Sequence, residues 1–292
     1  MISPYMESIL IFAGINTILA ISWYIAHCAG LISIGQGGFM AVGAYVSAYL
    51  TLNGIPFYPS LTIGAITSCV ISFIVGLPAL RIKGLYLILL TIGFGEIVRI
   101  FFLNFEPTGS AKGLGGMFPH TTLLNVYVTV AIVMFFINLI NDSHFGRAME
   151  AVLEDEDAAE TLGVNLTTTK LLAFSIGGFI AGLGGGFYAH YALYIDSNDF
   201  GILRSVEILV YPLLGGVSSL WGGVLGALLL TSLTEALRVA RDFRMEIYGS
   251  IIVLTMIFRP QGLLGKHTIS WKSAWRVLQL FKFKYKIRQW QF

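Results

Sequence analysis

A long uncharged stretch is the feature that most constrains how this chain can fold. No Asp, Glu, Lys or Arg occurs from Ser8 to Leu80, a length of roughly three membrane crossings at about 20 residues each. The 292 residues are 56% hydrophobic and only 12% charged, which a domain with a polar surface does not match. A water-soluble fold could not cover that much apolar surface, so the sequence predicts an all-α integral membrane protein.

Apolar segments of membrane-spanning character recur along the whole chain. Hydropathy predicts spans near 8–27, 37–52, 60–80, 84–104, 123–141, 171–193, 205–218, 219–238 and 245–258. Several are short or rich in glycine, so we expect a polytopic helical bundle of about nine transmembrane helices, some of them short or broken. The breaks are expected at "SIGQGG" (33–38) and "LLGGVSSLWGG" (213–223), because freed backbone groups at membrane depth need protein or a watery cavity around them.

The distribution of basic residues predicts the orientation in the membrane. Residues 259–292 hold eight of the eighteen Lys and Arg residues and no acid, and such segments stay on the cytoplasmic side. Counting back across the predicted spans places the loop at 142–170 inside as well and the N-terminus outside. Arg238, Arg241 and Arg244 then fall on the outside, so either the positive-inside bias is locally broken or the 205–218 segment is re-entrant. The N-terminus has no basic n-region, so we expect the first helix to remain a membrane span and not a cleaved signal peptide.

The chain divides by composition into a transmembrane domain at 1–265 and a tail at 266–292. The last residues, "FKFKYKIRQWQF" (281–292), alternate basic and aromatic side chains. This pattern favours a cytoplasmic anchor on anionic lipid, with a disordered end as the alternative.

Glycine is abundant, and its spacing in one span predicts a close helix crossing. Two adjacent small-residue rows lie there: Gly177, Ala181 and Gly185, and beside them Gly178, Gly182 and Gly186. Small residues four apart make a flat helix face, and in lipid such a face lets two backbones approach closely. We expect an internal helix crossing here, and the alternative is a face that lines a substrate path.

Two pairs of opposite charges lie within predicted spans. Glu96 and Arg99 are three residues apart and share one helix face, and Arg204 and Glu207 have the same spacing. Each pair either neutralises itself or faces a translocation cavity, because charges inside a membrane are costly and point to a partner or a pathway.

No site of hydrolytic or redox chemistry emerges from the sequence. The phosphate-binding pattern G-x-x-x-x-G-K-[ST], the zinc pattern H-E-x-x-H and any paired-cysteine motif are missing. Cys28 and Cys69 both lie in apolar segments, where buried packing is expected. We therefore expect no enzyme, cofactor, metal or nucleic-acid partner, and any ATP that drives this protein must be bound by another chain.

The acidic side chains are concentrated in one loop. Seven of the sixteen lie between Asp142 and Glu160. The loop predicts two short amphipathic helices, the first capped by Asp142 or Ser143 and ended by Gly163, the second capped by Asn165. The predicted apolar stripe of the first consists of Ala148, Met149, Val152, Ala159 and Leu162. Such a hairpin is either simply solvated or a docking surface for another protein.

One motif favours docking. Asp157-Ala158-Ala159, three further residues and Gly163 resemble the Glu-Ala-Ala loop of ATP-binding-cassette importer permeases, with Asp in place of Glu. Longer stretches in the same order are similar to the LivM-type permease subunit of the branched-chain amino acid importers. These are "GLISIGQGGFMAVGAYVSAYL" (30–50), "RIKGLYLILLTIGFGEIVRIFF" (81–102), "GRAMEAVLEDEDAAETLGVNLTTTKLLAF" (146–174), "GGVSSLWGGVLGALLL" (215–230) and "FRPQGLLG" (258–265).

The resemblance implies a permease of the bacterial or archaeal cytoplasmic membrane. It implies a second, related permease chain, two cytoplasmic ATP-binding-cassette ATPases and an external substrate-binding protein as partners, with alternating access as the mechanism. The residues that would couple to the ATPases are Glu154, Asp157, Ala158, Ala159, Leu162 and Gly163. The translocation path would be lined by Gln36, Gly37, Glu96, Arg99, Glu207, Ser218 and Ser219.

Two other functions remain open at this point. An ion-coupled secondary transporter or channel would use acids within its spans, and Glu96 and Glu207 are the candidates for that role. An importer permease for urea or other small amides would have the same architecture, because in such importers the external binding protein does most of the selecting.

Overall fold

The computed structural model describes residues 3–80, 82, 84–236, 249–250, 253, 257 and 262–264. Five helices in this part are long and apolar enough to cross a membrane: α1 (Pro4–Cys28), α3 (Phe57–Ala79), α4 (Leu85–Asn104), α5 (Leu123–Asp142) and α8 (Leu166–Ala192). A sixth apolar helix, α2 (Gln36–Leu52), is shorter. The expected helical, multi-pass membrane protein is therefore confirmed.

The expected number of nine crossings is not confirmed. The predicted spans 205–218 and 219–238 correspond to α9 (Ile202–Gly215) and α10 (Leu220–Ala236), which form a pair bent by 116°. The pair is thus one broken span or a re-entrant loop. Gly216, with φ of +118°, ends α9 in a backbone conformation suited to glycine, within the stretch 213–223 where a break was predicted. Most of the predicted span 245–258 and the whole tail 266–292 lie outside the described residues.

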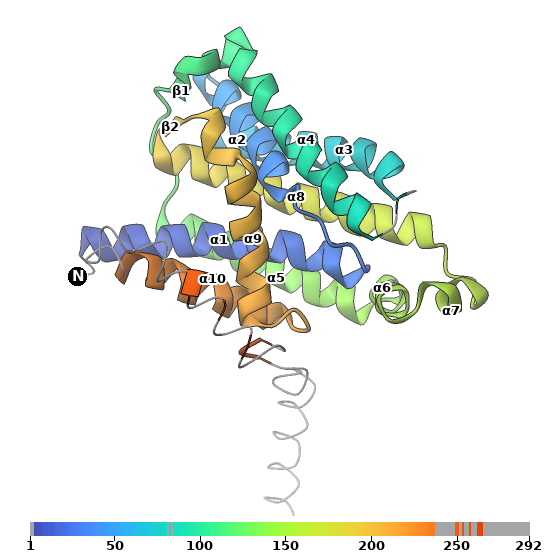
Figure 1. Cartoon of the computed structure of the whole chain (residues 1–292). Helices are drawn as coiled ribbons and strands as arrows, with labels where there is room; N and C mark the ends of the chain where they lie inside the picture. The colour runs from blue at the N-terminus through green and yellow to red at the C-terminus, as the bar shows by residue number, and fades with distance from the viewer. Residues whose placement is uncertain are drawn as a thin grey trace, which may run out of the picture.

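The two ends of the bundle carry different structures (Figure 1). The start of α1 and the short antiparallel strands β1 (Leu114–Gly115) and β2 (Tyr194–Ile195) lie at one end, here called the N-terminal end. The two short helices α6 (His144–Glu154) and α7 (Glu156–Thr161) lie at the opposite end, here called the loop end. The N-terminus and the acidic loop are therefore on opposite sides of the bundle.

Helix α8 is the centre of the core and packs against α1, α2 and α3. Its two glycine rows face those helices, which confirms the predicted close crossing. A methyl group on Gly182 would lie 2.7 Å from Ser68 Cβ, and one on Gly185 would collide with the Met40 carbonyl of α2. The Ser68 hydroxyl lies at the same crossing and donates to the Gly178 carbonyl at 2.8 Å. Close packing and a hydroxyl hydrogen bond together hold helices in lipid.

Helix α2 begins inside the protein, as the "SIGQGG" break predicted. Residues 31–35 are irregular, and their backbone groups find partners on neighbouring helices. The Trp23 ring nitrogen donates to the Ser33 carbonyl at 2.9 Å, and the Ile34 amide donates to Thr91 Oγ1 at 3.1 Å. These bonds satisfy a break that lipid could not.

We predict that Gly182→Ala destabilises the protein and that Gly93→Ala does not. The added methyl group at Gly182 meets Ser68 and the Ala65 backbone at 3.0 Å or less, and overpacking of this kind costs about 1–3 kcal/mol. Gly93 faces open space in α4, where alanine is the better helix former. Thermal unfolding of the two variants in one detergent measures the difference, and equal melting temperatures would contradict the assigned crossing.

Candidate functional site

The acidic loop folds into a capped helix hairpin. Ser143 Oγ accepts the Gly146 amide at the start of α6, and Asn165 Oδ1 accepts the Thr168 amide at the start of α8, so two predicted caps are confirmed. The predicted first helix is wrong in one respect, because it breaks at Asp155. The Asp155 carboxylate accepts the amides of Asp157 and Ala158, both at 3.0 Å, and begins α7.

The hairpin is held to the bundle by a few buried contacts. Met149, Val152 and Ala159 are buried, as their places in the predicted stripe required. Lys170, at the start of the α8 span, places its ammonium nitrogen 2.7 Å from Glu156 Oε1. The hairpin therefore has a fixed position on the loop end and is not a free segment.

The six residues predicted to couple to ATPases divide into two groups. Five are exposed on the hairpin: Glu154, Asp157, Ala158, Leu162 and Gly163. Ala159 is buried and packs inward instead. Leu162 was expected within the apolar stripe, but 80% of it is exposed, because α7 starts afresh at Asp155 and turns this residue outward. The sequence analysis missed Leu153, a second exposed apolar side chain near the end of α6.

The predicted pair Arg204–Glu207 is the centre of a network that joins three helices. Arg204 on α9 donates to Glu207 Oε2 at 2.6 Å and to Asn16 Oδ1 of α1 at 2.7 Å. Asn16 donates to Thr231 Oγ1 of α10 at 2.9 Å, and the Tyr211 hydroxyl donates to Glu207 Oε1 at 2.7 Å. The charges are therefore neutralised by each other, and the sequence analysis missed the neutral partners. Asn16, an amide within an apolar run, was the available signal.

The other predicted path residues lie apart from that network. Glu96 accepts from Arg99 Nε at 2.7 Å, and Arg99 also donates to Asn198 at 3.2 Å, so the self-neutralising alternative holds for this pair too. Gly37, at the buried start of α2, donates its amide to Ser205 Oγ of α9 at 3.1 Å. The adjacent Gln36 is 1% exposed.

Two polar cavities open toward opposite ends of the bundle. The cavity at the N-terminal end, here called the outer pocket, measures about 320 Å³ and is lined by Tyr5, Ser8, Ile9, Phe12, Asn16, Arg204, Glu207, Thr231, Thr234 and Glu235. The cavity at the loop end, here called the inner pocket, measures about 620 Å³ and is lined by Tyr24, His27, Cys28, Asn141, Gly146, Met149, Glu150, Leu153, Glu154, Val217 and Ser218. Of the predicted path residues, Glu207 thus lines the first cavity and Ser218 the second, and Ser219 follows Ser218 in the turn before α10.

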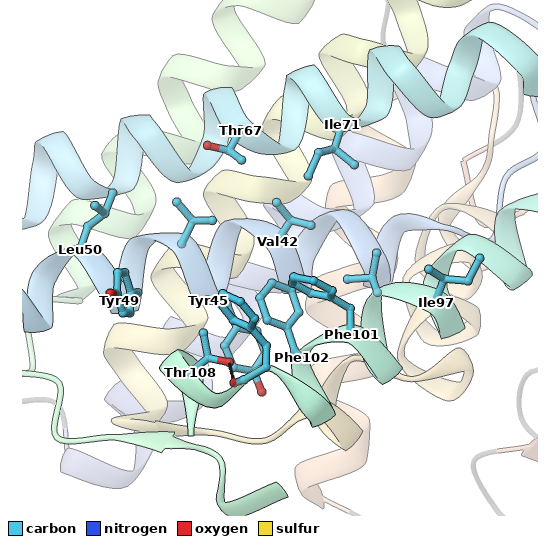
Figure 2. A pocket seen from close by; sticks show the side chains of 13 residues that line it. Val42, Tyr45, Tyr49, Leu50, Thr67, Ile71, Ile97, Phe101, Phe102 and Thr108 are labelled. Atoms are coloured by element: carbon cyan, nitrogen blue, oxygen red, sulfur yellow. Dashed lines mark hydrogen bonds between the residues drawn. The ribbon is translucent and has the colours of Figure 1, made fainter. Parts of the chain in front are cut away.

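A third cavity has a different character (Figure 2). It measures about 450 Å³ between α2, α3 and α4, and none of its thirteen lining side chains is charged. Tyr45 stacks on Phe102 within it, with ring centroids 4.0 Å apart. The cavity offers apolar surface and hydroxyl groups but no counter-charge, so it suits an alkyl chain and not an ionised molecule.

Apolar spanning helices around a glycine-packed core, with polar cavities reaching in from both ends, define a membrane-transport protein. A comparison with protein families matches residues 5–259 to the branched-chain amino acid transport system permease component. The chain belongs to this family of transport permeases.

Curated relatives agree with that assignment. The chain is 33% identical over 296 aligned residues to the high-affinity branched-chain amino acid transport system permease protein LivM of Salmonella typhimurium, and 32% identical to LivM of Escherichia coli. Each alignment covers 89% of this chain and 68% of the relative. A probable LivH permease of Methanocaldococcus jannaschii is 23% identical, covering 94% of this chain and 95% of that protein. No solved structure matches the chain.

We predict that Asp155→Ala frays α7 and that Asp155→Asn does not. The alanine variant loses the oxygen that accepts the Asp157 and Ala158 amides, a loss of about 1 kcal/mol for an N-cap. Hydrogen exchange at these two amides should accelerate about fivefold, as expected from about 1 kcal/mol. Asparagine keeps an acceptor oxygen and should preserve protection. Unchanged exchange in the alanine variant would contradict the cap.

Proposed function

We propose that this chain is the transmembrane permease subunit of an ATP-driven importer for branched-chain amino acids. It would work with a second, related permease chain, two cytoplasmic ATP-binding-cassette ATPases and an external substrate-binding protein. The substrate class follows from the names of the LivM and LivH relatives and from the family. The 142–170 loop would face the cytoplasm and receive the ATPases.

One observation carries the coupling role: the acidic hairpin is anchored to the bundle, yet it presents apolar side chains to solvent. Leu153 and Leu162 are 42% and 80% exposed. Burial of a leucine side chain contributes about 1.5–3 kcal/mol, so these two residues are suited to a partner surface. The acidic residues around them, Glu154, Asp157 and Glu160, would meet basic groups and orient the partner.

The hairpin also has a route to the interior of the bundle. Glu154 and Leu153, on the exposed part of α6, line the inner pocket together with Val217 and Ser218 from the α9–α10 turn. A force on α6 would therefore displace one wall of a polar cavity. This arrangement suits alternating access, in which ATP-driven movement of the loop opens and closes the inner side.

The orientation is supported by a backbone contact near the end of the described chain. The amides of Leu263 and Leu264 donate to the carbonyls of Leu214 and Gly215 at 3.0 and 2.9 Å. Those carbonyls end α9, directly before the turn that lines the inner pocket. Residues 262–264 thus lie at the loop end. If the basic tail that follows stays inside, the acidic loop faces the cytoplasm as well.

We expect Leu162→Glu to abolish both ATPase binding and ATP-driven leucine uptake. Leu162 is highly exposed, so the change should leave the fold intact while it places a charge in the docking surface. The assay is pull-down of the tagged chain from its native membrane in mild detergent, with mass spectrometry of the co-purifying chains.

The matched control for this experiment is Phe118→Glu. Phe118 is 72% exposed and precedes α5, at the end away from the hairpin. This variant should retain the ATPases. Recovery of the ATPases with Leu162→Glu, at the level of the unaltered chain, would refute the docking role of the hairpin.

A further inference from the structure

The two polar pockets follow one face of α1. The outer pocket uses Tyr5, Ser8, Ile9, Phe12 and Asn16 of this helix, and the inner pocket uses Tyr24, His27 and Cys28. These positions repeat at intervals of three and four residues, which keeps them on one side of a helix. Ala20 continues the series between the pockets and is fully buried. The two pockets are thus aligned along α1.

A small apolar cluster has members close to residues of both pockets, and we call it the plug. It consists of Ala20, Tyr211, Leu214, Ala227 and Leu230, and it is separate from the main core. Asn16 and Tyr24 are eight residues apart, which is about 12 Å along a helix. Along α1, only about two helical turns therefore separate the linings of the two pockets.

Opposite charges line the outer pocket, and one of them is bonded to Tyr211 of the plug. The Arg204 and Glu207 side chains are 15% and 34% exposed, and their closest atoms are 2.6 Å apart. Arg204 is further held by Asn16 at 2.7 Å and lies 5.9 Å from the Tyr188 ring centroid. Each charge thus compensates the other, as partly buried charges require.

We propose that the outer pocket is the permease's own binding site for a zwitterionic amino acid, with Arg204 receiving the carboxylate and Glu207 the ammonium group. This inference rests on the proposed function and specifies its transport site. A zwitterion carries both charges, so it can replace each half of the internal ion pair without leaving a buried charge alone. A neutral amide or a singly charged ion cannot do this.

The remaining walls fit the rest of such a molecule. Ile9 and Phe12 line the pocket and provide apolar surface for an aliphatic side chain. The cavity, at about 320 Å³, lies at the small end of the range for ligand sites, as suits a single amino acid. The apolar cavity between α2, α3 and α4 is larger but has no charged lining residue, so it offers no partner for either charge.

Tyr211 contacts both the binding site and the plug. Its hydroxyl donates to Glu207 at 2.7 Å, while the residue is fully packed within the plug. An ammonium group that replaces Arg204 on Glu207 Oε2 would share the carboxylate with this hydroxyl, which bonds to Oε1. Occupancy of the site would therefore act on a carboxylate that also holds Tyr211.

The first test measures uptake by the complete transporter, with both permease chains and the ATPases in proteoliposomes and the binding protein outside. Arg204→Gln and Glu207→Gln should each lower leucine uptake at least tenfold, with ATPase co-purification unchanged because the acidic hairpin is intact. Lys112→Gln removes an exposed cation near β1 at the same end and should stay within twofold of the unaltered transporter. Unaltered uptake by Arg204→Gln would overturn the proposal.

The second test needs neither ATP nor a variant of the ion pair. Ser8, which lines the outer pocket and is partly exposed, is replaced by cysteine in a complete transporter lacking Cys28 and Cys69, and labelled with a membrane-impermeant thiol reagent. Leucine should slow labelling at least threefold, whereas labelling of Lys112→Cys should not change. Equal labelling of the Ser8→Cys variant with and without leucine would overturn the binding site, whereas absence of ATP-driven uptake in the unaltered transporter would contradict the proposed function instead.

Discussion

Close backbone contact around α8 is the constraint on which the other features depend. Lipid tails are as apolar as leucine, so apolar side chains alone give helices little reason to associate in a membrane. Gly178, Gly182 and Gly185 remove the side chains that would keep α8 away from α2 and α3, and Ser68 adds a hydrogen bond at the crossing. The result is a compact group of helices against which shorter and irregular segments can be held.

Those irregular segments create the polar positions inside the bundle. Helix α2 starts at Gln36 only because Trp23 and Thr91 satisfy the backbone of residues 33–34. Helix α9 ends at Gly215, and its last carbonyls accept the amides of Leu263 and Leu264. Each break would be too costly against lipid. Surrounded by protein, the breaks bring Gly37 next to Ser205 and let Arg204 reach Asn16.

The sequence indicated which elements exist better than how they meet. The glycine rows, the break before α2 and the caps at Ser143 and Asn165 were predictable, because each depends on local chemistry. The break between α9 and α10 was predicted as well, from the glycines and serines of 213–223, but its angle of 116° was not, because hydropathy records only that both helices are apolar. The network around Arg204 joins residues up to 215 positions apart in the chain, a proximity that spacing along one helix cannot reveal.

In the acidic loop, the prediction of a continuous first helix, and with it the place of Leu162, was wrong for a related reason. A continuous helix from 144 to 162 would have placed Ala159 and Leu162 on one stripe with Met149. Asp155 caps a new helix instead, so the register shifts: Ala159 is still buried, as predicted, but Leu162 faces solvent. Four consecutive acidic residues at 154–157 obscured this cap, because any of them could have been merely a solvated charge.

The α9–α10 turn connects the proposed binding site with the proposed coupling hairpin. Ser218 in this turn lines the inner pocket together with Glu154 of α6. Tyr211, near the end of α9, belongs to the plug and bonds to Glu207. In the proposed cycle, a movement of α6 would be transmitted to the plug through α9 and through the glycine contacts that join α9 to α10. Coupling by this route needs only that the α9–α10 turn has two arrangements. It needs no long series of small side-chain shifts across the core.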